Sequence, residues 1–121
     1  MPRKKDKGVV KRYIVTPDKH FPLHDVAAIN CLVKAIEIVK PTGYVDLGDV
    51  GEWHGASHWQ WKRKKRPALE YQLPYIDKEI IDVNNGMDII DEALDKVNCK
   101  EKHMCEGNHD DWLNQFVEEH P

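Results

Sequence analysis

The feature that most constrains the fold is an alternation of short β-type runs with longer amphipathic segments. Residues 12–16 (RYIVT), 43–47 (GYVDL) and 102–106 (KHMCE) have the length of strands. Between them, apolar residues in segments 25–39 and 76–97 recur at steps of three and four, the spacing of one buried helical face. Strands alternating with helices of this length predict βαβ units and a parallel sheet, and therefore an α/β fold.

The ends of the predicted helices carry boundary signals of different strength. Asp25 is a plausible N-cap of the first helix, and Pro41 ends it. In the second helix, Pro74 marks either the start or a kink, and Gly86 weakens the centre because glycine costs about 1 kcal/mol relative to alanine there. A last amphipathic turn or two is expected over residues 112–117.

Composition bounds the class of protein. At 121 residues, with 40% apolar and 32% charged residues, the chain (1–121) has the size and balance of a single globular domain. Its net charge of −3 gives no overall reason to expect nucleic acid, and it contains no apolar stretch of the roughly 20 residues that cross a bilayer, so we expect no membrane partner. Three cysteines, none in a C-x-x-C, favour a reducing cytoplasm.

Polar residues follow each predicted strand. These strand-end residues are Asp18 and His20, then Asp49 and Glu52, then Asn108, His109 and Asp110. The carboxyl ends of parallel strands meet at the edge where open α/β sheets bind ligands, and neighbouring strands lie about 4.8 Å apart. The clusters can therefore converge on one or two cations. Carboxylate, imidazole and amide donors without thiolate suit Mn²⁺, Fe or Zn²⁺.

Each cluster also has an ordinary structural explanation. Asp18 follows a proline and can be a turn residue, while Asp110 can cap the last helix. The sequence G-N-H-D around His109 is the most specific of the three. Their joint order, each behind a strand, favours a metal site over three unrelated turns.

The three motifs together resemble a known enzyme family. D-x-H at Asp18, G-D-x-x-E at Asp49 and G-N-H-D at Asn108, in this order, look like the motifs of calcineurin-like metallophosphoesterases, particularly short bacterial and phage members. The resemblance covers nearly the whole chain. It implies a metallophosphoesterase-like βαβαβ half of an α/β/β/α sandwich with a mostly parallel sheet. It also implies a metal-dependent phosphoesterase, namely a phosphodiesterase or nuclease.

The resemblance implies two divalent metal ions, with Mn preferred over Fe, Zn or Ni. By this resemblance, Asp18 and His20 bind the first ion, Asp49 bridges both, and Asn108 binds the second. A hydroxide activated between the two ions would attack the phosphorus.

The same resemblance assigns roles to three further residues. His109 would hydrogen-bond the scissile phosphate or protonate the leaving group, and Asp110 would orient its ring. Glu52 would support the site without binding metal directly.

Family members continue with a histidine-bearing strand and a G-H-x-H motif, and neither is present in this sequence. Either the chain is a fragment of a longer protein, or the site is completed by a partner chain, such as a second copy, or by local residues. The local candidates are His24, His54, His58 and His120.

A basic run, WKRKKRP, follows the second motif and can contact a phosphate backbone, with neighbouring tryptophans stacking on bases. It can equally be a solvated loop. The candidate substrate-binding residues of this region are His54, His58, Lys62, Arg63 and Lys65.

Two functional hypotheses follow. The first is a phosphoesterase that acts on a phosphoester, including nucleic acid. The alternative is a catalytically inactive nucleic-acid- or partner-binding module that retains half of the metal site.

Overall fold

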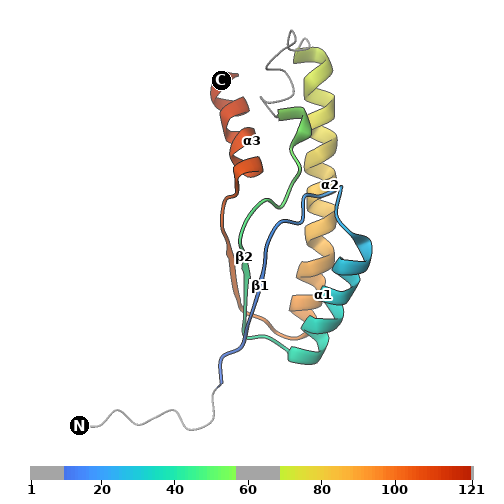
Figure 1. Cartoon of the computed structure of the whole chain (residues 1–121), viewed down its shortest axis with the longest axis vertical. Helices are drawn as coiled ribbons and strands as arrows, with labels where there is room; N and C mark the ends of the chain where they lie inside the picture. Colours follow the sequence, from blue (N-terminus) through green and yellow to red (C-terminus); the bar gives the residue numbers. More distant parts are fainter. Residues whose placement is uncertain (1–9, 57–68, 121) are drawn as a thin grey trace, which may run out of the picture.

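The computed structural model describes residues 10–56 and 69–120, and it confirms the alternation of strands and helices (Figure 1). The elements in chain order are β1 (Tyr13–Thr16), α1 (Val26–Val39), β2 (Gly43–Asp46), a 3₁₀ turn η1 (His54–Ala56), α2 (Leu69–Lys96), β3 (Glu101–Met104) and α3 (Asn108–Glu119).

The three strands form one parallel sheet in the order β1-β2-β3. Thr16 pairs with Asp46, and Asp46 pairs with Met104, so the last residues of all three strands lie in line. The α/β class and the parallel sheet are confirmed. The turns that follow the strands therefore start from one edge, as the sequence predicts.

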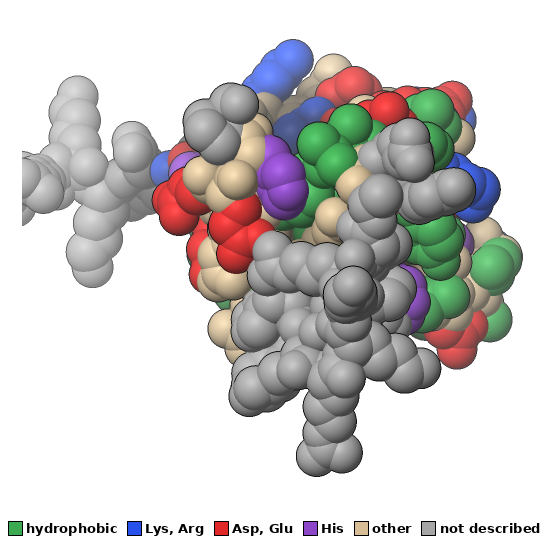
Figure 2. Space-filling view, turned by 90° about the horizontal axis from the view of Figure 1, so that it is seen from above, with side chains coloured by type: hydrophobic (Ala, Val, Ile, Leu, Met, Phe, Trp, Pro, Cys, Tyr) green, Lys and Arg blue, Asp and Glu red, His purple; other side chains and the backbone are tan. Residues whose placement is uncertain are grey.

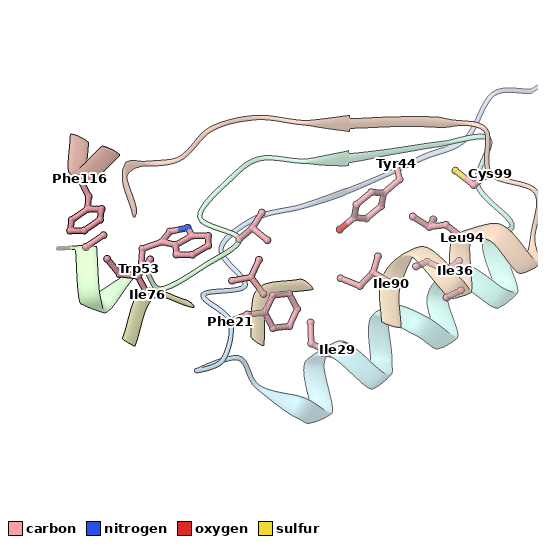
Figure 3. Packing of buried hydrophobic residues seen from close by; sticks show 14 residues of the cluster. Phe21, Ile29, Ile36, Tyr44, Trp53, Ile76, Ile90, Leu94, Cys99 and Phe116 are labelled. Carbon is pink, nitrogen blue, oxygen red and sulfur yellow. The ribbon is translucent and has the colours of Figure 1, made fainter. Parts of the chain in front are cut away.

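Helices α1 and α2 pack against one face of the sheet (Figure 3). Tyr44 of β2 points into this layer, where Ile36, Ile90 and Leu94 are buried. Side chains of a strand alternate between faces, and Tyr13 and Val15 on the opposite face are 45% and 52% exposed. The described part of the chain thus buries one face of its sheet well and leaves the other largely open.

The predicted boundaries of α1 are confirmed, whereas those of α2 need correction. The Asp25 carboxylate accepts a hydrogen bond from the Ala28 amide at 3.1 Å, as an N-cap does. Helix α2 runs through Pro74 without a break. Gly86 has a packing reason, because a Cβ there would lie 2.5 Å from the ring of the buried Phe21.

Helix α3 is longer than predicted. It starts at Asn108, so the G-N-H-D motif supplies its first turn instead of preceding it. Gly107 is the N-cap, and Asp110 lies inside the helix, where its carboxylate accepts from the Gly107 amide at 3.0 Å. Asp110 therefore takes part in capping the helix, as expected, but as the N3 residue of a capping box and not as the N-cap.

Among the described helices, none combines the length and the apolar character needed to cross a membrane. Cys31, Cys99 and Cys105 are free thiols.

Candidate metal centre

The turns after the three strands converge at the carboxyl edge of the sheet. One ligand atom each of Asp18, His20 and Asp49 lies within 4.8 Å of the others, and the same holds for His20, Glu52 and His109. Asn108 lines the same cavity of about 480 Å³ as Asp18, His20 and Asp49. Figure 2, which views the molecule from above, shows acidic side chains next to a histidine on the described surface left of centre. The structure therefore brings together all four predicted metal ligands.

The turns after β1 and β2 are joined through their backbones, and we call this contact the first junction. Four backbone hydrogen bonds connect residues 18–21 with residues 48–52, at 2.9 to 3.2 Å. One of them runs from the His20 amide to the Asp49 carbonyl. These backbone hydrogen bonds join the two turns without using the side chains of Asp18, His20 or Asp49.

Four non-glycine residues of these turns have left-handed backbones. Asp18, His20, Asp49 and Trp53 have φ of 43°, 50°, 51° and 51°. Each such residue costs about 1–3 kcal/mol and persists only where its surroundings enforce it. Strain of this kind is concentrated in functional sites, and here it falls on three of the four predicted ligands.

The turns after β2 and β3 are joined mainly through side chains, and we call this contact the second junction. Asp110 is its centre. Its carboxylate accepts hydrogen bonds from the Asp49 amide at 2.8 Å, the Gly107 amide at 3.0 Å and Trp53 Nε1 at 3.0 Å. Gly107 is required by the close approach, since a Cβ there would lie 2.3 Å from Asp49 Oδ1.

His109 is held by residues other than the one expected. Its backbone amide donates to Asp49 Oδ1 at 2.8 Å, and its Nδ1 lies 2.7 Å from the Glu52 carbonyl oxygen. A carbonyl can only accept, so Nδ1 carries the proton and Nε2 is left available. The Trp112 ring lies at 3.9 Å between ring centroids. Glu52 and Trp112, instead of Asp110, orient the imidazole.

The cavity is acidic. Three carboxylates line it, those of Asp18, Asp49 and Asp111, and none of the described lysines or arginines does. His20 Nδ1 is buried and lies 2.9 Å from Glu52 Oε2 without hydrogen-bond geometry, so it has no hydrogen-bond partner among the described residues. Clustered carboxylates beside an imidazole fit a divalent cation, which would neutralise the mutual repulsion.

Three lining residues are absent from the sequence predictions, namely Asp111, Trp112 and Gln115. They lie three, four and seven residues after Asn108 and therefore share its face of α3. Helical spacing could have predicted that these three residues share a face with Asn108. That prediction requires knowing that α3 begins at the G-N-H-D motif.

Of the predicted substrate-binding residues, His54 alone lies in the part of the chain that the structure describes. His54 lines a second cavity of about 310 Å³, which also contains Glu52 and Tyr75. His58, Lys62, Arg63 and Lys65 lie outside the described residues.

Neither His24 nor His120 reaches the centre. His24 packs edge-on against Phe21, and His120 Nδ1 lies 2.9 Å from the Phe116 carbonyl oxygen. Neither residue belongs to the two ligand clusters or lines the cavity of about 480 Å³.

Comparisons of the chain with protein-family models, with curated proteins and with solved structures found no match. The geometry of the site is therefore the basis of the functional proposal.

Proposed function

We propose that this protein is a divalent-cation-dependent phosphoester hydrolase of the metallophosphoesterase type, with a phosphodiester or nucleic acid as substrate. The observation that carries the proposal is the convergence of Asp18, His20 and Asp49 within 4.8 Å, in a cavity that Asn108 and His109 also line. The metallophosphoesterase-like fold belongs to the same proposal.

The charge of the cavity supports a role for cations. An anionic phosphoester would be repelled by the carboxylates of Asp18, Asp49 and Asp111 unless positive charge offset them. Asp18, His20 and Asp49 would hold one ion, and Asp49 with Asn108 the other. Two divalent ions, with Mn²⁺ preferred, would supply charge neutralisation of the phosphoryl oxygens and activation of water.

In this proposal, His109 is the residue that handles a proton. The Glu52 carbonyl fixes Nδ1 as the donor, so Nε2 is the atom that can give a proton to a leaving oxygen or bind a phosphoryl oxygen. Trp112 limits rotation of the ring. Asp110 acts through the backbone, because its carboxylate fixes the amides of Asp49 and Gly107.

The proposal is tested by Mn²⁺-dependent hydrolysis of bis(p-nitrophenyl) phosphate, together with Mn²⁺ binding measured by calorimetry. We expect Asp49→Asn to abolish turnover and most metal binding. His109→Ala should keep metal and lower kcat by about 10²–10⁴-fold, the usual contribution of acid–base catalysis. Asp82→Asn, at an acidic residue of α2 that pairs with Lys78, is the control and should change neither quantity.

Equal loss of metal in both variants would contradict this division of roles. Mn²⁺ binding by the wild type without any turnover would favour the binding module over the enzyme. Absence of Mn²⁺ binding would remove the proposal altogether.

A further inference from the structure

A buried ion pair involves Lys19, which lies between the candidate ligands Asp18 and His20 in the chain. Lys19 and Asp46 are 6% and 1% exposed, and Lys19 Nζ lies 2.5 Å from Asp46 Oδ2. Removing both charges from water is expensive, and apolar residues of similar size often give equal or greater stability. Overall stability is therefore a poor explanation of this pair.

The pair connects the two turns that carry three of the predicted ligands. Lys19 stands between Asp18 and His20 in the chain, and its Nζ also donates to Thr16 Oγ1 at 2.8 Å. Asp46 is the last residue of β2, and its second oxygen accepts from the Gly48 amide at 3.0 Å. Gly48 directly precedes Asp49 in the chain.

Tyr44 completes the network. Its hydroxyl lies 2.5 Å from Thr16 Oγ1 and 3.5 Å from Asp46 Oδ2, and Lys19 Nζ is 5.7 Å from its ring centroid. Burial raises the pKa of Tyr44, so the phenol stays neutral at physiological pH. The charged pair is thus surrounded by fixed hydrogen-bonding groups, which give it a defined distance and direction.

The geometry points to a positioning role. We propose that Lys19 and Asp46 are positioning residues of the metal centre, whose ion pair holds the turn of Asp18 and His20 in register with the turn of Asp49. The left-handed backbones of these three residues need such an external restraint. This inference rests on the proposed function, because it concerns the same metal centre.

The deciding variant is Lys19→Met/Asp46→Asn. It removes both charges but keeps an oxygen that can accept from the Gly48 amide. Lys19→Met alone should lower Tm strongly, because it leaves Asp46 buried and unpaired, and the double variant should recover most of that loss. At this recovered Tm, we still expect Mn²⁺ affinity and kcat to be lower by about tenfold or more, as for supporting residues of other metal sites.

Lys102→Met/Asp95→Asn is the matched control. It removes an ion pair of 2.8 Å on the exposed surface and should leave the Mn²⁺ Kd and kcat unchanged. If the Lys19/Asp46 double variant shows wild-type Kd and kcat, the pair is merely structural and the inference is overturned.

A milder pair of variants decides the matter if the double variant does not fold. Thr16→Val removes one acceptor of Lys19 Nζ, whereas Thr16→Ser keeps it. Thr16→Val should weaken Mn²⁺ binding about fivefold, the equivalent of one hydrogen bond, and Thr16→Ser should not. Equal affinity in both overturns the inference. Failure of the wild type to bind Mn²⁺ would overturn the proposed function as well, whereas normal wild-type turnover with unaffected variants would overturn only the positioning role.

Discussion

The first and second junctions hold the same site together by different means. In the first junction, four backbone hydrogen bonds join residues 18–21 to residues 48–52. In the second, hydrogen bonds from the Asp49 and Gly51 amides and from Trp53 Nε1 all depend on a single carboxylate, that of Asp110. A backbone ladder leaves the side chains of Asp18 and His20 free for chemistry. In the second junction, by contrast, the Asp110 side chain of the G-N-H-D motif is used to hold the turns together.

Asp49 and Asp110, one acidic residue from each of two motifs, make different kinds of contact. Asp49 contributes its carboxylate to the predicted metal site and also accepts from the His109 amide. The Asp110 carboxylate accepts hydrogen bonds from Asp49, Trp53 and Gly107, and Asp110 is not among the residues that line the cavity. The position of a carboxylate in a motif therefore does not by itself tell a ligand from a structural residue.

The largest loss of stability is expected from Phe21→Ala, which removes the buried side chain that supports the first junction. Phe21 is fully buried, packs against Gly86 of α2 and takes part in the backbone ladder. Loss of its ring should lower the free energy of unfolding by about 3–5 kcal/mol. Urea denaturation measures this, with the exposed Leu23→Ala as control. A loss below about 1 kcal/mol would show that the ladder stands without the ring.

An intermediate effect is expected from Asp110→Ala, which breaks the second junction. The change leaves two backbone amides and Trp53 Nε1 without their acceptor, and hydrogen bonds to charged groups contribute about 1.5–3 kcal/mol each. With partial replacement by water, we expect a loss of about 2–4 kcal/mol. Amide hydrogen exchange should accelerate at Asp49 and Gly107 but not at His20. Uniform acceleration across both junctions would mean that they are not independent.

Asp111→Ala is the matched control for that experiment. Asp111 is the next residue of α3, is exposed, and accepts from Gln115 at 2.8 Å. Its removal should cost less than about 0.5 kcal/mol, as for pairs within one exposed helix.

The smallest effect on stability is expected at Glu79 of α2. Its carboxylate accepts hydrogen bonds from backbone amides of η1, much as Asp110 accepts them in the second junction. It accepts from the amides of His54 and Gly55 at 2.8 and 2.6 Å, and burial raises its pKa despite these bonds. The folded state then binds the proton at a higher pH than the unfolded state does. The contribution of Glu79 to the free energy of unfolding is therefore highest below about pH 4 and falls as the pH rises through the raised pKa.

Glu79→Gln should remove this dependence. The variant should gain stability relative to the wild type between about pH 4 and pH 7, measured as thermal unfolding across that range. Glu92→Gln, at an exposed glutamate of the same helix, should leave the curve unchanged. A parallel shift of both curves would show that burial does not control Glu79.

The strands, the helices and their order were predictable because each depends on local spacing. The apolar runs of β1 and β2 and the Asp25 cap were read directly from the sequence and are confirmed. The continuity of α2 through Pro74 and the need for Gly86 were not, because the reason for Gly86 is Phe21, a residue 65 positions away in the chain.

The convergence of the candidate ligands was predictable for a similar reason, because parallel strands place their carboxyl ends together. The sequence could not show which carboxylate faces the cavity and which ties the turns, since this depends on contacts between Asp110 and residues 49–53. It also could not show the Lys19–Asp46 pair, which only the folded sheet brings together. The metal-binding and catalytic roles themselves stay predictions.

At Asp18, His20 and Asp49, the residue that would best suit the left-handed backbone is not one that could bind a metal ion. Glycine adopts such backbones without steric penalty, so glycine at any of these positions would relieve strain that the wild-type side chain imposes. The side chains of these three candidate ligands therefore lower the stability of the fold at this edge, and the proposed role in metal binding would account for that cost.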